Sequence, residues 1–450
     1  MYDIKNYLIY VVIALTITVS IILLWPGYIY WDSYQQLNEA ITGKFTDWHP
    51  PIMSLIWGKL IWIFGSEGIF LCLNLVLCIT SVYIISKWFS GFYRTTIFIL
   101  LFFNPLFFGH VGIIWKDVAL ANCVILSCAL ILNSIINERD LQHIEKLIIL
   151  LFLIIASFLR ANAPFITAPL IAYVIISQNR SYRTLLIALA LIPMFILVTP
   201  ILNNRLIGAE KSYAINSLFI FDIGGASAQS KKNLFPGEWS IEEENLIING
   251  CYNAEMWNEY IYGKCPFVYQ KIINKNLSKA WLQIISEHPA AYFKHRLVHF
   301  NAFMRYIGPS TSYFYYFPGI PGIQADIYPP ISGNPIMKFY ERAMAKMDRQ
   351  PWNLPFIWLL ISLGLFIASC PNKTRHERAV FFISLGSLLY ATGYILIGVA
   401  SDFRYILPSA YASISCLLAL LSRKVVIGNS TTRKAGVFVS FTMIVVGFIF

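Results

Sequence analysis

Seven ionisable residues stand where apolar stretches of this sequence begin or end, and their side chains are the best placed to do chemistry. They are Asp32, Asp47, His49, Lys116, Asp117, Arg160 and Arg404. An ionisable side chain at the depth of a membrane is costly, so its presence is by default a sign of function. Carboxylates can accept protons, and basic side chains can hold anions. The argument is strongest for Asp117 and Arg404.

The candidates in the first polar segment also have structural interpretations. A carboxylate at a membrane boundary can be solvated or can cap the start of a helix, and both alternatives stay open for Asp32 and Asp47. His49 can simply hydrogen-bond a loop carbonyl. The following Pro50 and Pro51 predict an extended backbone that leads into a helix.

The basic candidates have such interpretations too. Lys116 can snorkel toward the membrane surface, and Arg160 can pair with the C-terminus of a helix. Asp402 lies two residues before Arg404. We expect these two side chains to form a local salt bridge, and we do not expect Asp402 to act in catalysis.

The composition shows what kind of molecule must position these residues. Of the 450 residues, 57% are hydrophobic and 13% are charged, and the mean hydropathy is +0.62. A soluble domain carries about 25% charged residues. The apolar residues form long continuous runs, which in lipid must be helices because every backbone polar group needs an internal partner. The first run, residues 7–25, is long enough to cross a hydrocarbon core of about 30 Å, and we expect a retained signal-anchor helix there.

The sequence predicts an all-α polytopic membrane protein with about eleven transmembrane helices. The expected spans are residues 7–25, 67–86, 95–113, 118–136, 147–160, 164–177, 184–202, 352–370, 379–399, 405–421 and 436–450. They define three regions. An N-terminal transmembrane module (1–202) contains the first outer loop (26–66), an extracytoplasmic loop region (203–351) follows, and a C-terminal transmembrane module (352–450) ends the chain.

The distribution of basic residues predicts the orientation. The net charge of +11 suggests nucleic acid in a soluble protein, but here Lys and Arg gather in alternate short loops, as they do on the cytoplasmic side of a membrane. We therefore expect a cytoplasmic N-terminus, a multi-pass protein of the cytoplasmic membrane, and no nucleic-acid partner. All seven candidate residues then fall on the outer face.

Two outer segments have recognisable features. In the first outer loop, aromatic residues at helical spacing and the apolar stretch 51–64 predict two helices that lie in the membrane interface. In the second, residues 240–249 and 276–304 have helix signals, and 306–322 is dense in aromatic residues. Cys251 and Cys265 are expected to form a disulfide worth about 3 kcal/mol, with two free thiols as the alternative. No nearby His completes a metal-ligand set.

Four short stretches together resemble a known family. They are the segment from Asp32 to "GKFTDWHPP", the following "FGSEG", "NPLFFGHVGIIWKD" and "SDFRYILPS". In this order they resemble the C-type glycosyltransferase fold, and most closely glycosyltransferase family 39 and the protein-mannosyltransferase-like enzymes. The chain departs from many of these enzymes in having Ser33 after Asp32 where they have a second acid.

The resemblance implies a sugar transfer from a polyprenyl-phosphate carrier to an acceptor on the outer face. Asp32 would be the general base of an inverting reaction. Asp117 matches a second acidic position and would orient the acceptor, or a divalent metal if one is used. Arg404 would bind the carrier phosphate, and Tyr405 would support it. No other cofactor is implied.

The remaining candidates are assigned to substrate binding. Lys116 and Arg160 would add positive charge beside the phosphate, and His49 and Asp47 would contact substrate. The implied partners are the lipid-linked sugar donor, membrane lipids, and a lipid, polysaccharide or protein acceptor.

Two other functions remain as alternatives. The first is a flippase or transporter of a lipid-linked saccharide, although no internal repeat of the kind common in transporters is evident. The second is an oligosaccharide polymerase or ligase, for which Arg296 and His299 in the large outer loop would be the candidate residues.

Overall fold

The computed structural model describes residues 2–176, 181–307, 350–370, 373–422 and 424–427, and isolated positions between 335 and 342. Within this part of the chain all regular structure is helical, and only single β-bridges join extended segments. The predicted all-α class is therefore confirmed. The predicted span at 436–450 and the aromatic stretch beyond Ile307 lie outside the described residues.

The N-terminal half consists of ten α-helices joined by short connections. They are α1 (Tyr2–Leu24), α2 (Trp31–Thr42), α3 (Pro51–Phe64), α4 (Ile69–Ser86), α5 (Phe92–Phe102), α6 (Pro105–Val111), α7 (Lys116–Ile136), α8 (His143–Ser157), α9 (Pro164–Ile175) and α10 (Ser181–Pro200), which continues into the π-helical turn η1 (Ile201–Leu206).

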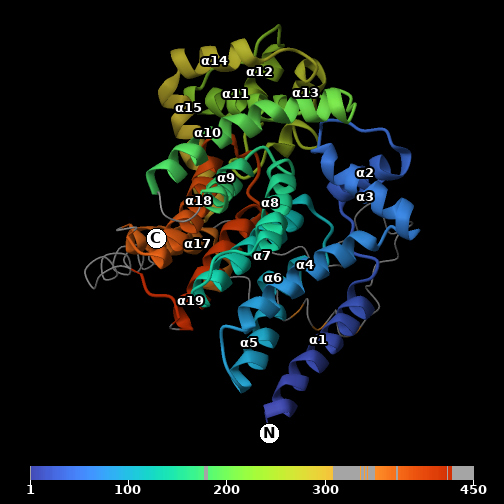
Figure 1. The fold of residues 1–450 in the computed structure, drawn as a ribbon. Coiled ribbons are helices and arrows are strands. Elements are labelled where there is room, and N and C mark those ends of the chain that lie inside the picture. Colours follow the sequence, from blue (N-terminus) through green and yellow to red (C-terminus); the bar gives the residue numbers. More distant parts are fainter. Residues whose placement is uncertain are drawn as a thin grey trace.

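The second half has an outer layer and a return to the bundle. The outer layer comprises α11 (Asn216–Ser230), α12 (Ile241–Asn249), η2 (Trp257–Tyr260), α13 (Pro266–Ile272), α14 (Ser278–Glu287) and α15 (Pro289–Met304). The return comprises η4 (Pro351–Asn353), α17 (Pro355–Ser369), α18 (Arg375–Ile397), η5 (Phe403–Ile406) and α19 (Leu407–Leu421). The outer layer lies together at one end of the molecule, and the N-terminus lies at the opposite end (Figure 1).

Six helices are long and apolar enough to cross a membrane, and the count becomes seven if the bent pair α5–α6 is one span. These helices indicate a multi-pass membrane protein. The helices at the predicted spans 147–160, 164–177 and 352–370 are shorter. For example, α9 has 12 residues and so a length of about 18 Å, against about 30 Å for a hydrocarbon core. The predicted count of eleven spans is not confirmed.

The bend between α5 and α6 has a local cause. Proline at position 105 has no backbone N–H and keeps Asn104 out of the helical region, so the first helix must end before it. The Asn104 side chain then caps α6 by accepting a hydrogen bond from Leu106 N. The two helices meet at an angle of 55°.

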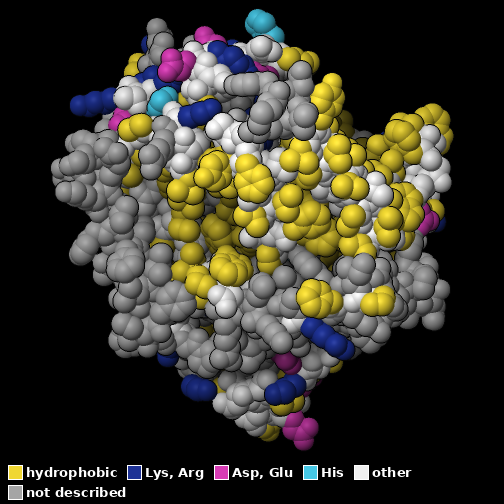
Figure 2. Space-filling view, turned by 90° about the horizontal axis from the view of Figure 1, so that it is seen from below, with side chains coloured by type: hydrophobic (Ala, Val, Ile, Leu, Met, Phe, Trp, Pro, Cys, Tyr) yellow, Lys and Arg dark blue, Asp and Glu magenta, His cyan; other side chains and the backbone are white. Residues whose placement is uncertain are grey.

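Burial separates central from peripheral helices. In α7, 83% of the residues of the apolar window are buried, whereas in the window that starts in α10 the share is 11%. On the face shown in Figure 2, hydrophobic side chains cover a continuous central area, and charged side chains are confined to its edges. The helix α7 is therefore the core of the bundle, while α10 presents apolar side chains such as Leu186 and Leu197 outward.

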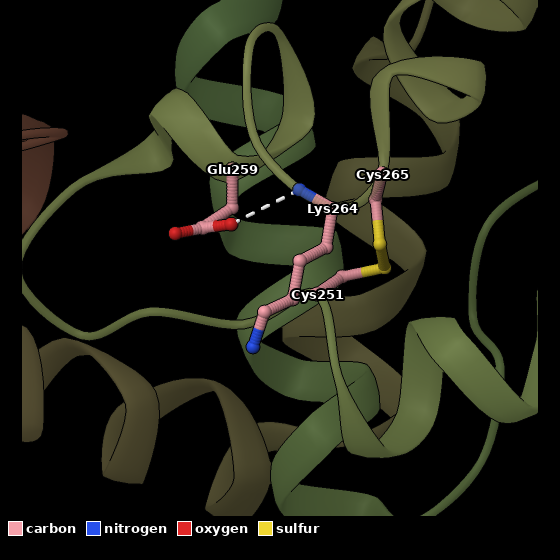
Figure 3. The surroundings of a disulfide bond; sticks show 4 residues. All are labelled: Cys251, Glu259, Lys264 and Cys265. Atoms are coloured by element: carbon pink, nitrogen blue, oxygen red, sulfur yellow. Dashed lines mark hydrogen bonds between the residues drawn. A yellow bond between two sulfur atoms is a disulfide. The ribbon is translucent and has the colours of Figure 1, made fainter.

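Residues 26–66 contact the segment that precedes α11. Asp47 N donates to Glu210 O at 3.0 Å, and Glu210 N donates to Phe45 O at 2.9 Å. Helices α2 and α3 form in the first outer loop, as predicted, and lie beside the outer layer (Figure 1). The predicted disulfide between Cys251 and Cys265 is present, and Glu259 accepts a hydrogen bond from Lys264 N beside it (Figure 3).

Candidate functional site

Two carboxylates and two arginines from four separate segments of the chain meet at the end of the bundle next to the outer layer. Arg404 Nη1 lies 3.0 Å from Asp32 Oδ2, and Arg404 Nε lies 3.8 Å from Asp117 Oδ2. Arg160 forms an ion pair with the other oxygen of Asp117. We call these four residues, with His49, Lys116 and Tyr405, the charged cluster.

Backbone pairing explains why the first outer loop lies beside the start of α7. Tyr28 N donates to Gly112 O at 2.8 Å, and Ile114 N donates to Tyr28 O at 3.0 Å. Ser33, in the first turn of α2, donates through its hydroxyl to the Ile114 carbonyl. These contacts place Asp32 against the first turn of α7.

The Arg404 side chain is held by aromatic rings and by a third carboxylate, that of Asp402. Its guanidinium carbon lies 4.3 Å from the centre of the Trp115 ring and 5.0 Å from that of Tyr405. Its Nη2 donates to Tyr405 Oη at 3.1 Å and lies 3.1 Å from Asp402 Oδ2. The predicted local salt bridge with Asp402 is thus confirmed. Arginine suits this position because its planar group can stack and donate at the same time.

Arg160 has a similar environment. It comes from the turn between α8 and α9, and its guanidinium carbon lies 4.2 Å from the centre of the Tyr405 ring. Its Nη2 donates to Tyr394 Oη at 2.7 Å, and its Nε donates to Asn162 Oδ1 at 3.2 Å. The Tyr405 ring is therefore close to both guanidinium groups.

His49 and Lys116 extend the cluster on the other side of Asp32. Lys116 Nζ lies 2.7 Å from His49 Nδ1, and His49 Nε2 lies 3.9 Å from Asp32 Oδ1. An ammonium group can only donate, so His49 accepts at Nδ1 and carries its proton on Nε2, which faces Asp32. Burial and the charge of Lys116 lower the pKa of His49 to about 3, which keeps the ring neutral.

The electrostatics of Asp32 are set by two opposing effects. Burial raises the pKa of its carboxyl, but the nearby charges, of which Arg404 is the largest, lower it by more. Asp32 is therefore held as an anion. Its side chain is 29% exposed, whereas Asp117 is completely buried, so Asp32 is the more accessible of the two carboxylates.

Several helices begin at the charged cluster. Asp32 is in the first turn of α2, Lys116 and Asp117 begin α7, and Arg404 is in the turn that precedes α19. Unpaired backbone N–H groups give each helix start a partial positive charge, which adds to that of the basic side chains. Buried His49 Nε2 and Asp117 Oδ2 have no hydrogen-bond partner among the described residues. The arrangement can thus hold an anion next to a carboxylate that can accept a proton.

One predicted residue lies outside the charged cluster. Asp47 Oδ1 accepts hydrogen bonds from Ser212 N at 2.6 Å and from Ser212 Oγ at 2.5 Å. It thereby links the first outer loop to the segment before α11. This geometry favours a structural role for Asp47.

Several residues of the site were not predicted. Trp115 and Tyr394 contribute rings to the arginine side chains, and Asn162 orients Arg160. Trp115 could have been proposed from its place beside Lys116, because interfacial aromatic residues often stack on basic side chains. Tyr394 lies within an ordinary apolar stretch that gives no such signal.

The cluster does not suit a divalent metal. Asp32 and Asp117 each face an arginine, so a cation would be repelled, and in the described part of the chain no group of three or more His, Cys, Asp or Glu residues could hold a metal ion. Comparison of the chain with models of known families, with curated proteins and with solved structures finds no match.

Proposed function

We propose that this protein is a membrane glycosyltransferase that takes a sugar from a polyprenyl-phosphate carrier and transfers it to an acceptor. The observation that carries the proposal is the charged cluster itself. A carboxylate at 29% exposure, that of Asp32, pairs with Arg404, and Arg160 and Lys116 belong to the same cluster at the ends of apolar helices. A lipid-linked phosphate would reach such a position from the membrane.

The reaction would need both kinds of group. The acceptor hydroxyl attacks the anomeric carbon as Asp32 takes its proton, and the bond between that carbon and the phosphate oxygen breaks. The electron pair leaves with the polyprenyl phosphate, whose charge Arg404, Arg160 and Lys116 would stabilise. Attack from the face opposite the phosphate inverts the configuration.

Arg404 gives this scheme an order of events. While it pairs with Asp32 at 3.0 Å, the carboxylate is a weak base. A bound phosphate competes for the same guanidinium. Each contact that Arg404 transfers from Asp32 to the phosphate would raise the basicity of Asp32, so the base would gain strength when the donor is present.

The polymerase or ligase alternative has less support. Its candidate residues, Arg296 and His299, are buried in the outer layer and bonded to Gly398 O and Ala254 O. A flippase remains the second candidate from the sequence, but no contact in the structure favours it. The proposal includes the finer topology: about eleven spans, a cytoplasmic N-terminus, and the charged cluster on the outer face of the cytoplasmic membrane.

The proposal can be tested with purified protein in detergent. Wild type, Asp32→Asn and Asp140→Asn would be supplied with a set of polyprenyl-phosphate sugars and membrane-lipid or polysaccharide acceptors, and product would be measured by mass spectrometry. Asp140 is the matched control because it is an exposed aspartate beside Arg375 and follows the C-terminus of α7, whereas Lys116 and Asp117 begin that helix. We expect Asp32→Asn to reduce transfer at least about a hundredfold and Asp140→Asn to leave it unchanged.

A binding measurement distinguishes a protein that binds the lipid phosphate without transferring sugar from one that has no phosphate site. Farnesyl phosphate would serve as a short carrier and farnesol as its uncharged control. Binding of farnesyl phosphate without any transfer would argue for a flippase. Equal affinity for the two lipids would remove the reason for a phosphate site.

A further inference from the structure

The segment between α18 and η5 is held by the outer layer. Arg296 Nη1 donates to Gly398 O at 2.7 Å, and Trp257 N donates to Val399 O at 3.0 Å. Met256 and Ala400 form an antiparallel β-bridge. Three consecutive residues, 398–400, are thus bonded to the outer layer. The partner nearest in sequence, Arg296, is 102 residues from Gly398.

The direction of the Arg296 side chain is itself fixed. It is buried, and its Nη2 lies 2.5 Å from Asp222 Oδ1. Asp222 also accepts from Trp281 Nε1 at 2.6 Å and lies 3.1 Å from His295 Nε2. The pairing with Asp222 thus orients the guanidinium whose Nη1 donates to Gly398 O.

Val399 and Ala400 are bonded to a loop, residues 251–265, whose two ends are joined to each other. The disulfide between Cys251 and Cys265 joins the two ends of the stretch that contains Met256 and Trp257 (Figure 3). His299 Nδ1 donates to Ala254 O at 2.7 Å, so α15 holds the loop a second time. We call residues 251–265 the disulfide loop.

Gly398 also fits closely against its surroundings. A Cβ atom on Gly398 would lie 2.7 Å from His299 Nε2 and 2.8 Å from Tyr394 O. Such distances are too short for real contacts, so glycine permits this close approach. Asp402 and Arg404 follow Ala400 by two and four residues. Any movement of the held segment therefore moves both of them.

We infer that Arg296 and the disulfide loop are positioning elements, which set Arg404 against Asp32 through the backbone of residues 398–400. The outer layer would thus have a defined part in phosphate binding without touching the phosphate. The consequence for binding rests on the proposed function, while the positional claim can be tested without it.

The first experiment measures backbone protection by hydrogen exchange with mass spectrometry on the full-length protein in detergent. The variants are Arg296→Lys, which keeps a charge for Asp222 but lacks the two separate nitrogens that contact Asp222 and Gly398, and the double variant Cys251→Ser/Cys265→Ser. Lys271→Gln is the matched control, because Lys271 forms an exposed outer-layer ion pair with Glu243. We expect exchange to become several-fold faster in peptides covering 254–258 and 398–405 in both test variants and to stay unchanged in the control.

The second experiment asks whether the effect passes through Arg404. Affinity for farnesyl phosphate would be measured for wild type, Arg296→Lys, Arg404→Gln and the combined variant. Loss of a hydrogen bond to a charged group corresponds to about tenfold in affinity. We expect Arg296→Lys to weaken binding by about that factor in wild type and to have no further effect in the Arg404→Gln background.

The outcomes separate the two claims. Unchanged exchange in 398–405, or an equal loss of affinity in both backgrounds, would overturn the positional inference. Absence of farnesyl phosphate binding by wild type would count against the proposed function, and the exchange experiment alone would then decide the positional claim. If Arg296→Lys fails to fold, the disulfide variant supplies the same two readouts.

Discussion

At the scale of single residues, Arg404 combines several interactions in one side chain. It pairs with Asp32 and Asp402, lies 3.8 Å from Asp117, and stacks on Trp115. A lysine could supply the charge but neither the stacking nor the fork of donors. The pairing with Arg404 therefore holds Asp32 as an anion, and another anion can engage the same guanidinium in its place.

Buried neutral histidines are the second residue-scale feature, and they make stability depend on pH. Burial lowers the pKa of His299 to about 3, and burial likewise lowers that of His49 to about 3. In the unfolded chain a histidine takes up its proton near pH 6.5. Between these values only the unfolded state gains protons, so acid favours unfolding, at a limit of about 1.4 kcal/mol per pH unit for each histidine.

We therefore predict that the melting temperature in detergent falls as the pH is lowered from 7.5 to 5.5, and that His299→Asn reduces this fall. Asparagine can keep the donor to Ala254 O without the titration. The measurement is thermal unfolding by intrinsic fluorescence at each pH. The exposed His143 provides the control, His143→Asn, for which the wild-type pH dependence should persist. An equal fall in wild type and His299→Asn would contradict the prediction.

At the scale of elements, the sequence located the starts of helices better than their ends. Lys116, Asp117 and Arg404 stand just before predicted spans, and Asp32 follows the end of the first span. The structure places all four at the starts of helices, close together. Their pairing was not predictable, since the partners Asp117 and Arg160 are 43 residues apart.

The predicted count of spans is not confirmed for a related reason. The predicted hairpin turn at 160–164 is present, but the apolar stretches on either side of it were counted as spans, although α8 has 15 residues and α9 has only 12. A helix end depends on caps and tertiary contacts, which a sliding average of hydrophobicity does not register. The disulfide was predictable because only one pair of cysteines lay outside the apolar runs.

The junction between the first outer loop and the outer layer gives an element-scale prediction. Asp47 accepts two hydrogen bonds from Ser212 across this junction. Replacing it by alanine leaves a backbone donor without its partner, so Asp47→Ala should destabilise the protein by about 2 kcal/mol. Thermal unfolding gives the stability, and farnesyl phosphate titration at a temperature where the variant is folded gives the affinity.

Ser212→Ala is the companion variant, because it removes one of the two hydrogen bonds and leaves the Asp47 carboxylate in place. It should show a smaller loss of stability in the same direction. Affinity for farnesyl phosphate should be unchanged in both variants. If Asp47→Ala greatly weakened farnesyl phosphate binding and kept normal stability, Asp47 would be a substrate-binding residue and the prediction would be contradicted.

At the scale of the whole molecule, the two ends differ in their charged contacts. The charged cluster and the outer layer lie at one end, whereas Arg139 pairs with Glu145 and Arg375 pairs with Asp140 where α8 and α18 begin. Basic residues concentrated in short loops favour the cytoplasmic side. The orientation then depends on whether the short helices cross the membrane.

Helix α17 decides this point, because it has 15 residues and so a length of about 22 Å. Exposed Cys370 follows its C-terminus, and Lys232 is exposed in the outer layer. We predict that a membrane-impermeant maleimide labels Lys232→Cys, made in a Cys370→Ser background, in intact cells, and labels native Cys370 only after permeabilisation. Labelling of both positions in intact cells would show that α17 does not cross. The reverse pattern would place the charged cluster in the cytoplasm, where a lipid-linked donor loses its advantage over a nucleotide sugar.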